Sequence, residues 1–175
     1  KHAPVTGFKA LNQDNLDDTA SKLTAWAWIK NRDADDDHVL VDRIRGTGKV
    51  WESNTNTTAF TNPDTVQRFL QRGVQVGNDV TVNTANESYV LWQWLVGDSA
   101  TTGSTTSPAG TIASTTIVAD TGHFSVGSYI GNGTDNSTIG HGLGGIPEII
   151  IVRNLSRSTY GLVWHTDGGG ATHTA

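Results

Sequence analysis

The sequence predicts an all-β protein, an antiparallel β-sandwich of the jelly-roll or lectin-like kind. Hydrophobic residues make up 35% and charged residues 17% of the 175 residues, and Thr, Ser, Asn and 20 Gly fill much of the remainder. Threonine suits a pleated strand, while Gly and Asn suit the turns between strands. In addition, the six Trp recur in segments that alternate with a period of two, as strands with two different faces do.

Net charge and the absence of Cys restrict the class of function. The net charge of −5 argues against a nucleic-acid partner, because phosphate contacts need a basic surface. No apolar run reaches the ~20 residues of a membrane-spanning helix, so we expect no membrane insertion. Without Cys there is no disulfide, thiolate metal site or cysteine nucleophile. Because Lys1 cannot be an initiator, we expect a chain processed or cut from a longer protein.

The first half of the chain is predicted to hold a lead-in segment and one β-rich unit. Residues 1–22 form the lead-in and residues 23–97 form the unit. Its predicted strands are Leu23–Lys30, His38–Asp42, Lys49–Trp51, Val74–Val82 and Ser88–Val96, with turns at Gly46–Gly48 and Gly77–Asp79. The segment Asp64–Gly73 stays ambiguous, because its apolar residues have helical spacing but the segment is short.

The second half is predicted to hold a linker and a second β-rich unit. Residues 98–111 form the linker, because this Thr-, Ser- and Gly-rich stretch has almost no large apolar residue. Residues 112–175 form the second unit. Its predicted strands are Ile112–Val118, Phe124–Ile130, Ile146–Arg153 and Tyr160–His165.

An internal repeat relates the two units at a constant offset of 123 residues, the distance from Asn31 to Asn154. Trp28–Arg32 matches Ile151–Leu155 in pattern, and Val39–Asp42 matches Leu162–His165 without a gap. At this offset, each copy is truncated at one end. We therefore expect either a fragment of a longer protein or strands supplied by a neighbouring chain, since open sheet edges invite pairing.

The acidic stretch after the first strand supplies the candidate metal ligands. Asp33, Asp35 and Asp37 are candidates for a Ca²⁺ site with oxygen ligands. The loop is not an EF-hand, because His38 and Ile44 stand where that loop needs Gly and a carboxylate. A solvated acidic hairpin tip is the alternative interpretation. The six His lack zinc-ligand spacing, and we predict no cofactor.

The six tryptophans are the candidate ligand-binding residues, because an exposed aromatic ring offers a large amphipathic contact surface. Core packing is the favoured interpretation for Trp92 and Trp94, since apolar residues occupy both faces of their strand. Trp51 is the ring that we expect to be exposed. It is therefore the candidate for ligand binding.

Motifs for catalysis are missing from the sequence, and we predict that the protein is not an enzyme. The stretch Arg45–Lys49 lacks the first Gly of a phosphate loop, and Val50 replaces its Ser or Thr. There is no Gly-x-Ser-x-Gly elbow. The strand-associated carboxylates, Asp42, Glu52, Glu87 and Glu148, show no pairing of the kind that glycoside hydrolases use.

Several motifs together resemble a domain of marine bacteriophage structural proteins. The pattern WIKNR…HxLxDxxRG stands here as Trp28–Arg32, His38–Asp42 and Arg45–Gly46, and the later YVxWxW strand stands as Tyr89–Trp94. Other matching segments are Ser53–Thr57, Gly73–Gly77, Tyr129–Thr134, Ile139–Leu143 and Pro147–Asn154. Val74 departs from the Phe of the family's GFxxG segment, and Leu23–Ala25 departs from its longer first strand.

This resemblance covers nearly the whole chain and implies a β-sandwich in a virion surface protein, such as a tail fibre, appendage or capsid decoration. It supplies no catalytic residues. We expect a homo-oligomer that assembles with other virion proteins at the virion surface or outside the cell, with a host-surface glycan as candidate receptor. The alternative is a stand-alone, lectin-like carbohydrate-binding module. A polysaccharide depolymerase is the third hypothesis.

Overall fold

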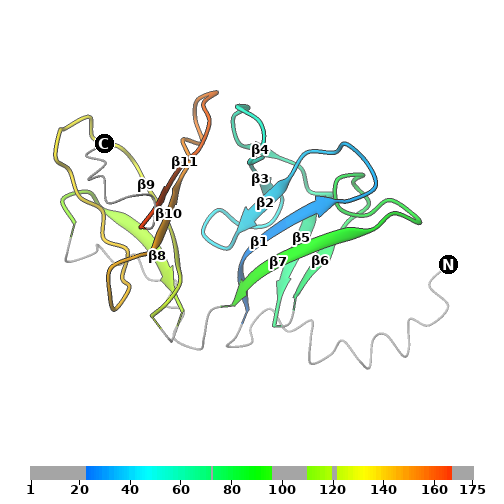
Figure 1. Cartoon of the computed structure of the whole chain (residues 1–175), viewed down its shortest axis with the longest axis horizontal. Helices are drawn as coiled ribbons and strands as arrows, with labels where there is room; N and C mark the ends of the chain where they lie inside the picture. The colour runs from blue at the N-terminus through cyan, green and yellow to red at the C-terminus, as the bar shows by residue number, and fades with distance from the viewer. Residues whose placement is uncertain (1–22, 72, 96–109, 120–121, 167–175) are drawn as a thin grey trace.

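The computed structural model describes residues 23–71, 73–95, 110–119 and 122–166, which contain strands and no helix (Figure 1). Every ladder between two strands in these residues is antiparallel, which confirms the predicted all-β, antiparallel class. One sheet has three strands and four have two, and the jelly-roll or sandwich topology stays a prediction. The described part of the chain has no helix able to span a membrane.

The strands fall into two groups that lie beside each other (Figure 1). The first group is β1 (Thr24–Asn31), β2 (Val39–Asp42), β3 (Lys49–Val50), β4 (Phe60–Thr61), β5 (Val66–Leu70), β6 (Gly73–Val76) and β7 (Tyr89–Leu95). The second group is β8 (Ser114–Val118), β9 (Ser125–Tyr129), β10 (Ile149–Val152) and β11 (Leu162–His165). The predicted lead-in, 1–22, and nearly all of the predicted linker lie outside the described residues.

The segment that was ambiguous between helix and strand forms the hairpin β5–β6. The predicted strand Val74–Val82 ends at Val76, because the chain turns at Gly77. The amide of Gly77 donates a hydrogen bond to the carbonyl of Thr65 at 2.7 Å. A Cβ at this position would lie 2.2 Å from the backbone oxygen of Asp64, so only glycine fits this close approach.

Strand β1 is the centre of the main sheet, whose order is β2–β1–β7. Its residues alternate between buried and half-buried, as the period of two predicts. The buried face packs into the main core with residues of β2, β3 and β5 and with Val82. This core contains Ala27, Ile29, Val39, Val41, Val50, Val66, Phe69 and Val82. Burial of each larger apolar side chain contributes about 1.5–3 kcal/mol.

A second apolar cluster joins the two groups of strands. Ala25 of β1 and Ile117 of β8 are both buried there. Ile44, Phe124 and Val126 pack against them and are partly buried. Strand β1 therefore has contacts with both groups, and the hairpin β8–β9 is held against the end of the main sheet.

The hairpin β10–β11 repeats the geometry of β1–β2. Trp26 pairs with Asp42 in the first hairpin, and Ile149 pairs with His165 in the second. Both pairs are related by the 123-residue offset that was found in the sequence, and so are the other three pairs of each ladder. The turns also agree, because the Oδ1 atoms of Asn31 and Asn154 each accept the amide two residues later, at 3.0 and 2.9 Å.

Candidate functional site: the tryptophan face of the main sheet

Four indole rings lie on one face of the main sheet, and we call Trp26, Trp28, Trp92 and Trp94 the tryptophan face. The ladder between β1 and β7 places Trp26 opposite Trp94 and Trp28 opposite Trp92. The ring centroids of these pairs are 4.4 Å and 5.3 Å apart. Such aromatic pairs contribute about 0.5–1.5 kcal/mol each beyond their burial. The face is therefore a rigid aromatic surface that β1 and β7 hold in register.

The two ends of the tryptophan face differ in exposure. Phe124, from the second group of strands, stacks near Trp26 and Trp94 with interplanar angles of 13° and 21°. At the other end, Trp92 is 44% exposed, while the other three rings are half-buried. The open end at Trp92 is thus the part of this face that a ligand or partner can reach.

A histidine stands beside the open end. The indole Nε1 of Trp28 donates a hydrogen bond to Nδ1 of His38 at 2.7 Å. Burial of the imidazole and the positive charge of Lys30 hold the pKa of His38 below its usual value, although Asp37 acts in the opposite direction. The ammonium of Lys30 itself donates to the carbonyls of Asn31 and Ala34, at 2.6 and 3.1 Å. His38 is therefore neutral at physiological pH, and its ring is fixed by Trp28.

Trp51, the predicted ligand-binding residue, is the most buried of the six tryptophans, with 9% of its surface exposed. The expectation that it is exposed is wrong. Its backbone pairs with Leu40 on β2 through hydrogen bonds of 3.0 and 3.1 Å. The guanidinium of Arg153 lies 5.7 Å from the ring centroid. Trp51 thus has a packing role between β2 and Arg153, the residue that follows β10.

The acidic loop between β1 and β2 uses its carboxylates in hydrogen bonds. Asp33 accepts the backbone amide of Ser88, and hydrogen bonds from the amide and then the hydroxyl of Ser88 lower the pKa of Asp33. Asp37 accepts the side-chain amide of Asn54 at 2.6 Å. Among the described residues, which include the calcium candidates Asp33, Asp35 and Asp37, there is no group of three His, Asp or Glu that could hold a metal.

A family model described as "Domain of unknown function (DUF7483)" matches residues 13–174. The chain belongs to the DUF7483 family. A search of curated proteins and a search of solved structures each found no match. The family description assigns no activity.

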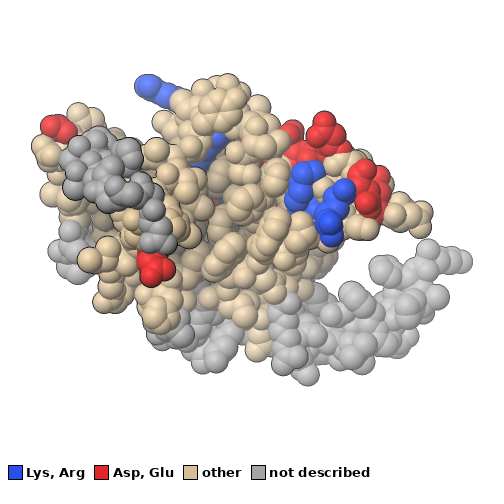
Figure 2. All heavy atoms as spheres, viewed as in Figure 1, with Lys and Arg blue, Asp and Glu red and all other residues tan. Residues whose placement is uncertain are grey.

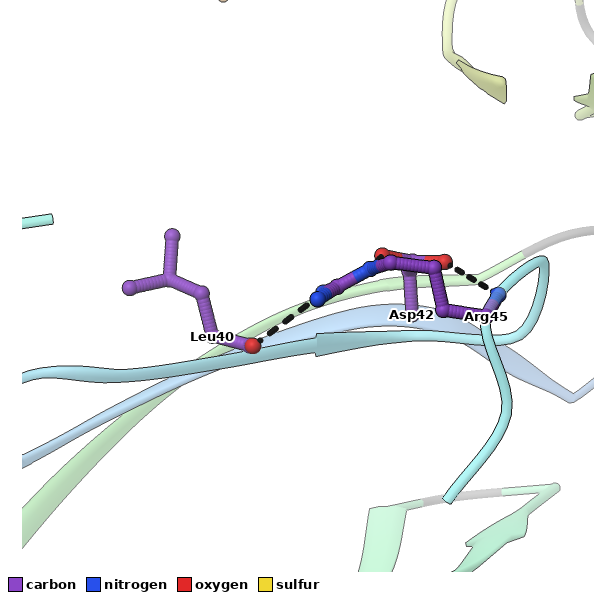
Figure 3. A network of polar contacts seen from close by, with 3 residues as sticks. All are labelled: Leu40, Asp42 and Arg45. Atoms are coloured by element: carbon purple, nitrogen blue, oxygen red, sulfur yellow. Dashed lines mark hydrogen bonds and ion pairs between the residues drawn. The ribbon is translucent and has the colours of Figure 1, made fainter. Parts of the chain in front are cut away.

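In this DUF7483 chain, the HxLxDxxRG motif builds the turn after β2 (Figure 3). The carboxylate of Asp42 accepts hydrogen bonds from Nε of Arg45 and, at 2.8 Å, from the Arg45 amide. The guanidinium reaches back to the carbonyl of Leu40 at 3.2 Å. Gly46 follows with φ of +94°, a conformation that suits glycine. Asp42 and Arg45 of the motif therefore hold this turn together, which is a structural role.

Two of the other carboxylates singled out in the sequence, Glu52 and Glu87, also accept hydrogen bonds. Glu52 accepts the hydroxyls of Thr55 and Thr57, at 2.8 and 3.0 Å. Glu87 accepts the side-chain amide of the buried Asn31 at 2.6 Å. These contacts fix loops of the DUF7483 chain, and the three carboxylates Asp42, Glu52 and Glu87 each have a different set of partners.

Sequence reasoning missed the open position of Trp92. The favoured interpretation placed Trp92 in the core, because apolar residues lie on both faces of its strand. In the structure, β7 is an edge strand of the main sheet, and Leu91, Trp92 and Leu95 are all exposed. The sequence of this strand, YVLWQWL, contains no charge, so it lacks the usual signal that distinguishes an edge strand from a buried one.

Proposed function

We propose that this DUF7483 chain is a structural module of a bacteriophage virion surface, such as a fibre, appendage or decoration, that acts by assembly and not by catalysis. The observation that carries the proposal is the exposure of apolar side chains in the hairpin β10–β11. Six of its apolar side chains are exposed, on both faces, from 36% at Val152 to 64% at Val163, while Trp164 is half-buried. The motif resemblance to phage structural proteins supplies the biological setting.

Exposed apolar surface of this kind needs a partner. Soluble monomers rarely leave large contiguous apolar patches open, and such patches mark interaction sites. The residues concerned are Ile149, Ile150, Ile151, Val152, Leu162 and Val163, which are all exposed. Burial against another protein at about 25 cal/mol per Å² would stabilise both the hairpin and the assembly. The chain is suited to a multi-subunit particle.

Two measurements test this proposal. Light scattering after gel filtration, over a range of protein concentrations, is expected to show an oligomer whose mass rises with concentration. Gold-labelled antibody against the chain is expected to decorate intact particles of a phage that encodes it. If the chain is strictly monomeric, the proposal that it acts by assembly is wrong. If the antibody does not label the particles, the proposed location on the virion is wrong.

The second candidate function is carbohydrate binding at the tryptophan face, and the exposure of Trp92 favours it. A partly exposed indole can cover an apolar face of a sugar, while His38 stands beside the ring system for polar contacts. On a glycan array, the chain is expected to bind a defined set of glycans, and Trp92→Ala is expected to abolish that binding. Equal binding by Trp92→Ala and wild-type protein would exclude this site.

A control separates a lost contact from a lost fold. Trp164→Ala also removes an indole, but a half-buried one on β11 and outside the tryptophan face. Its glycan binding is expected to equal that of the wild type. Loss of binding in both variants would indicate a general effect on folding and not a site at Trp92.

A further inference from the structure

Among the strands that have an edge without a ladder partner in the described residues are β7 and β10. Strand β7 ends the order β2–β1–β7, so one of its edges pairs with β1 and the other is open. Strand β10 pairs with β11 alone. An open edge presents a row of amide and carbonyl groups that can accept another strand.

The internal repeat indicates that a strand belongs at the open edge of β10. Strand β1, its counterpart 123 residues earlier, has β2 on one edge and β7 on the other. The pairs of β10 with β11 reproduce those of β1 with β2 in register. One edge of β10 corresponds to the edge of β1 that pairs with β7. In the first copy this edge has a partner strand, whereas in the second copy it has none among the described residues.

The edges of β7 and β10 also lack two of the features that keep edge strands apart, charge and proline. Natural proteins protect edges with Lys, other charges, proline or bulges. The sequences of β7 (YVLWQWL) and β10 (IIIV) contain no charge and no proline. Figure 2 shows charged side chains gathered at the end of the molecule near the β1–β2 loop, while much of the remaining surface in this view carries none.

From these observations, which extend the assembly part of the proposed function, we infer that β7 of one chain pairs antiparallel with β10 of a second copy. The main sheet then continues as β2–β1–β7 followed by β10 and β11 of the neighbour. The exposed Leu91 and Leu95 and the exposed Ile149 to Val152 lie along the two joined edges and supply apolar contacts. Because the edges differ, the contact is head-to-tail and produces rings or fibres.

Lysine substitutions test both edges. Leu91→Lys on β7 and Ile151→Lys on β10 introduce the charge that natural edges use against pairing. Each is expected to weaken self-association by at least about tenfold in sedimentation equilibrium. Thr159→Lys makes the same change of charge at an exposed position between β10 and β11 and is expected to leave association unchanged. Unchanged association in both edge variants would overturn the inference.

Disulfide trapping tests the pairing without depending on stability. The chain has no Cys, so Gln93→Cys, Ile150→Cys and Ile151→Cys each carry one thiol, and the two β10 positions sample both faces. A disulfide needs Cβ atoms about 3.5–4.5 Å apart. When the β7 variant is mixed with a β10 variant and oxidised, the mixed dimer is expected to exceed both symmetric dimers. Thr134→Cys, in an exposed loop, is the control for random collision.

The outcomes separate this inference from the proposed function. Oligomers that form without mixed β7–β10 disulfides, or with mainly β7–β7 disulfides, would overturn the edge pairing and leave assembly in place. A chain that stays monomeric would overturn both. Mixed disulfides together with dissociation by either edge lysine are the expected result.

Discussion

The indole of Trp28 and the imidazole of His38 form a hydrogen-bonded pair in which Nε1 of Trp28 donates to Nδ1 of His38 at 2.7 Å. The ring centroids are 5.5 Å apart. Nδ1 can accept this bond only while it carries no proton. The bond connects Trp28 of the tryptophan face to His38, the residue that precedes β2. Protonation of His38 at Nδ1 therefore breaks a hydrogen bond that holds the ring of Trp28 in place.

This pair predicts that acid weakens the fold near the tryptophan face. Burial and Lys30 lower the pKa of His38 in the folded protein, so the unfolded chain binds the proton more readily. The contribution of His38 to stability is complete above its unfolded pKa of about 6.5 and is lost as the pH falls below that value. Tryptophan fluorescence and the free energy of unfolding, followed from about pH 8 to pH 5, check this. In His38→Gln the fluorescence step is expected to disappear, and its persistence would contradict the assignment.

The Asp42–Arg45 pair predicts a large loss of stability on substitution. Both side chains are largely buried, and Asp42→Asn leaves the Arg45 guanidinium without its counter-charge (Figure 3). We expect a loss of about 3 kcal/mol in the free energy of unfolding, because breaking one side of a buried pair exposes the other to the full desolvation penalty. Urea denaturation measures it. Asp35→Asn, an exposed position in the acidic loop, is expected to change stability by less than about 0.5 kcal/mol.

The repeat provides a matched pair of asparagines for a third prediction. Asn31 is fully buried and donates to Asp36 at 2.7 Å and Glu87 at 2.6 Å, whereas its counterpart Asn154 is exposed. Asn31→Ala removes the donor from two carboxylates and is expected to cost about 2 kcal/mol. Asn154→Ala is expected to cost less than about 0.5 kcal/mol, since it loses only a turn at the surface. Equal costs in urea denaturation would contradict the network.

Much of the fold was predictable because strands with two unlike faces leave a period-two pattern in the sequence. The predicted segments contain the observed strands β2, β7, β10 and β11 and all of β1 except Asn31, and the pairs of β10–β11 correspond to those of β1–β2 at the offset of the sequence repeat. The segment of β5 was harder, because Val66, Phe69 and Leu70 have spacing that fits a helix. The hydrogen bonds to β6 decide it, and they depend on a turn that local spacing does not encode.

The candidate site was less predictable because burial depends on the position of a strand within its sheet. Trp51 follows a strand of only two residues, yet its side chain is buried and Arg153 lies over its ring. Trp92 lies in a strand that contains no charged residue, yet that strand is at an edge of its sheet and the ring is exposed. Local pattern reports which residues share a face, while strand order determines which face and which edge stay open.

The contacts of Arg153 connect the two groups of strands, and we expect their loss to loosen the hairpin β10–β11. Its guanidinium donates to the carbonyls of Thr55 and Thr57, at 3.0 and 2.5 Å, and lies over the ring of Trp51. Hydrogen bonds from a charged donor contribute about 1.5–3 kcal/mol each. Arg153→Met keeps most of the apolar stem but removes these bonds, so the backbone amides of β10 and β11 are expected to exchange with deuterium faster. The amides of β1 and β7 are expected to keep their protection.

A matched arginine completes this test. Arg157 is exposed in the loop between β10 and β11, so Arg157→Met makes the same chemical change without removing the contacts of Arg153. Its β10 and β11 amides are expected to exchange at the wild-type rate. If both variants accelerate exchange equally, the general loss of charge and not the contact with Thr55, Thr57 and Trp51 explains the effect. If neither does, the contacts of Arg153 with Thr55, Thr57 and Trp51 do not hold β10–β11 against the first group of strands.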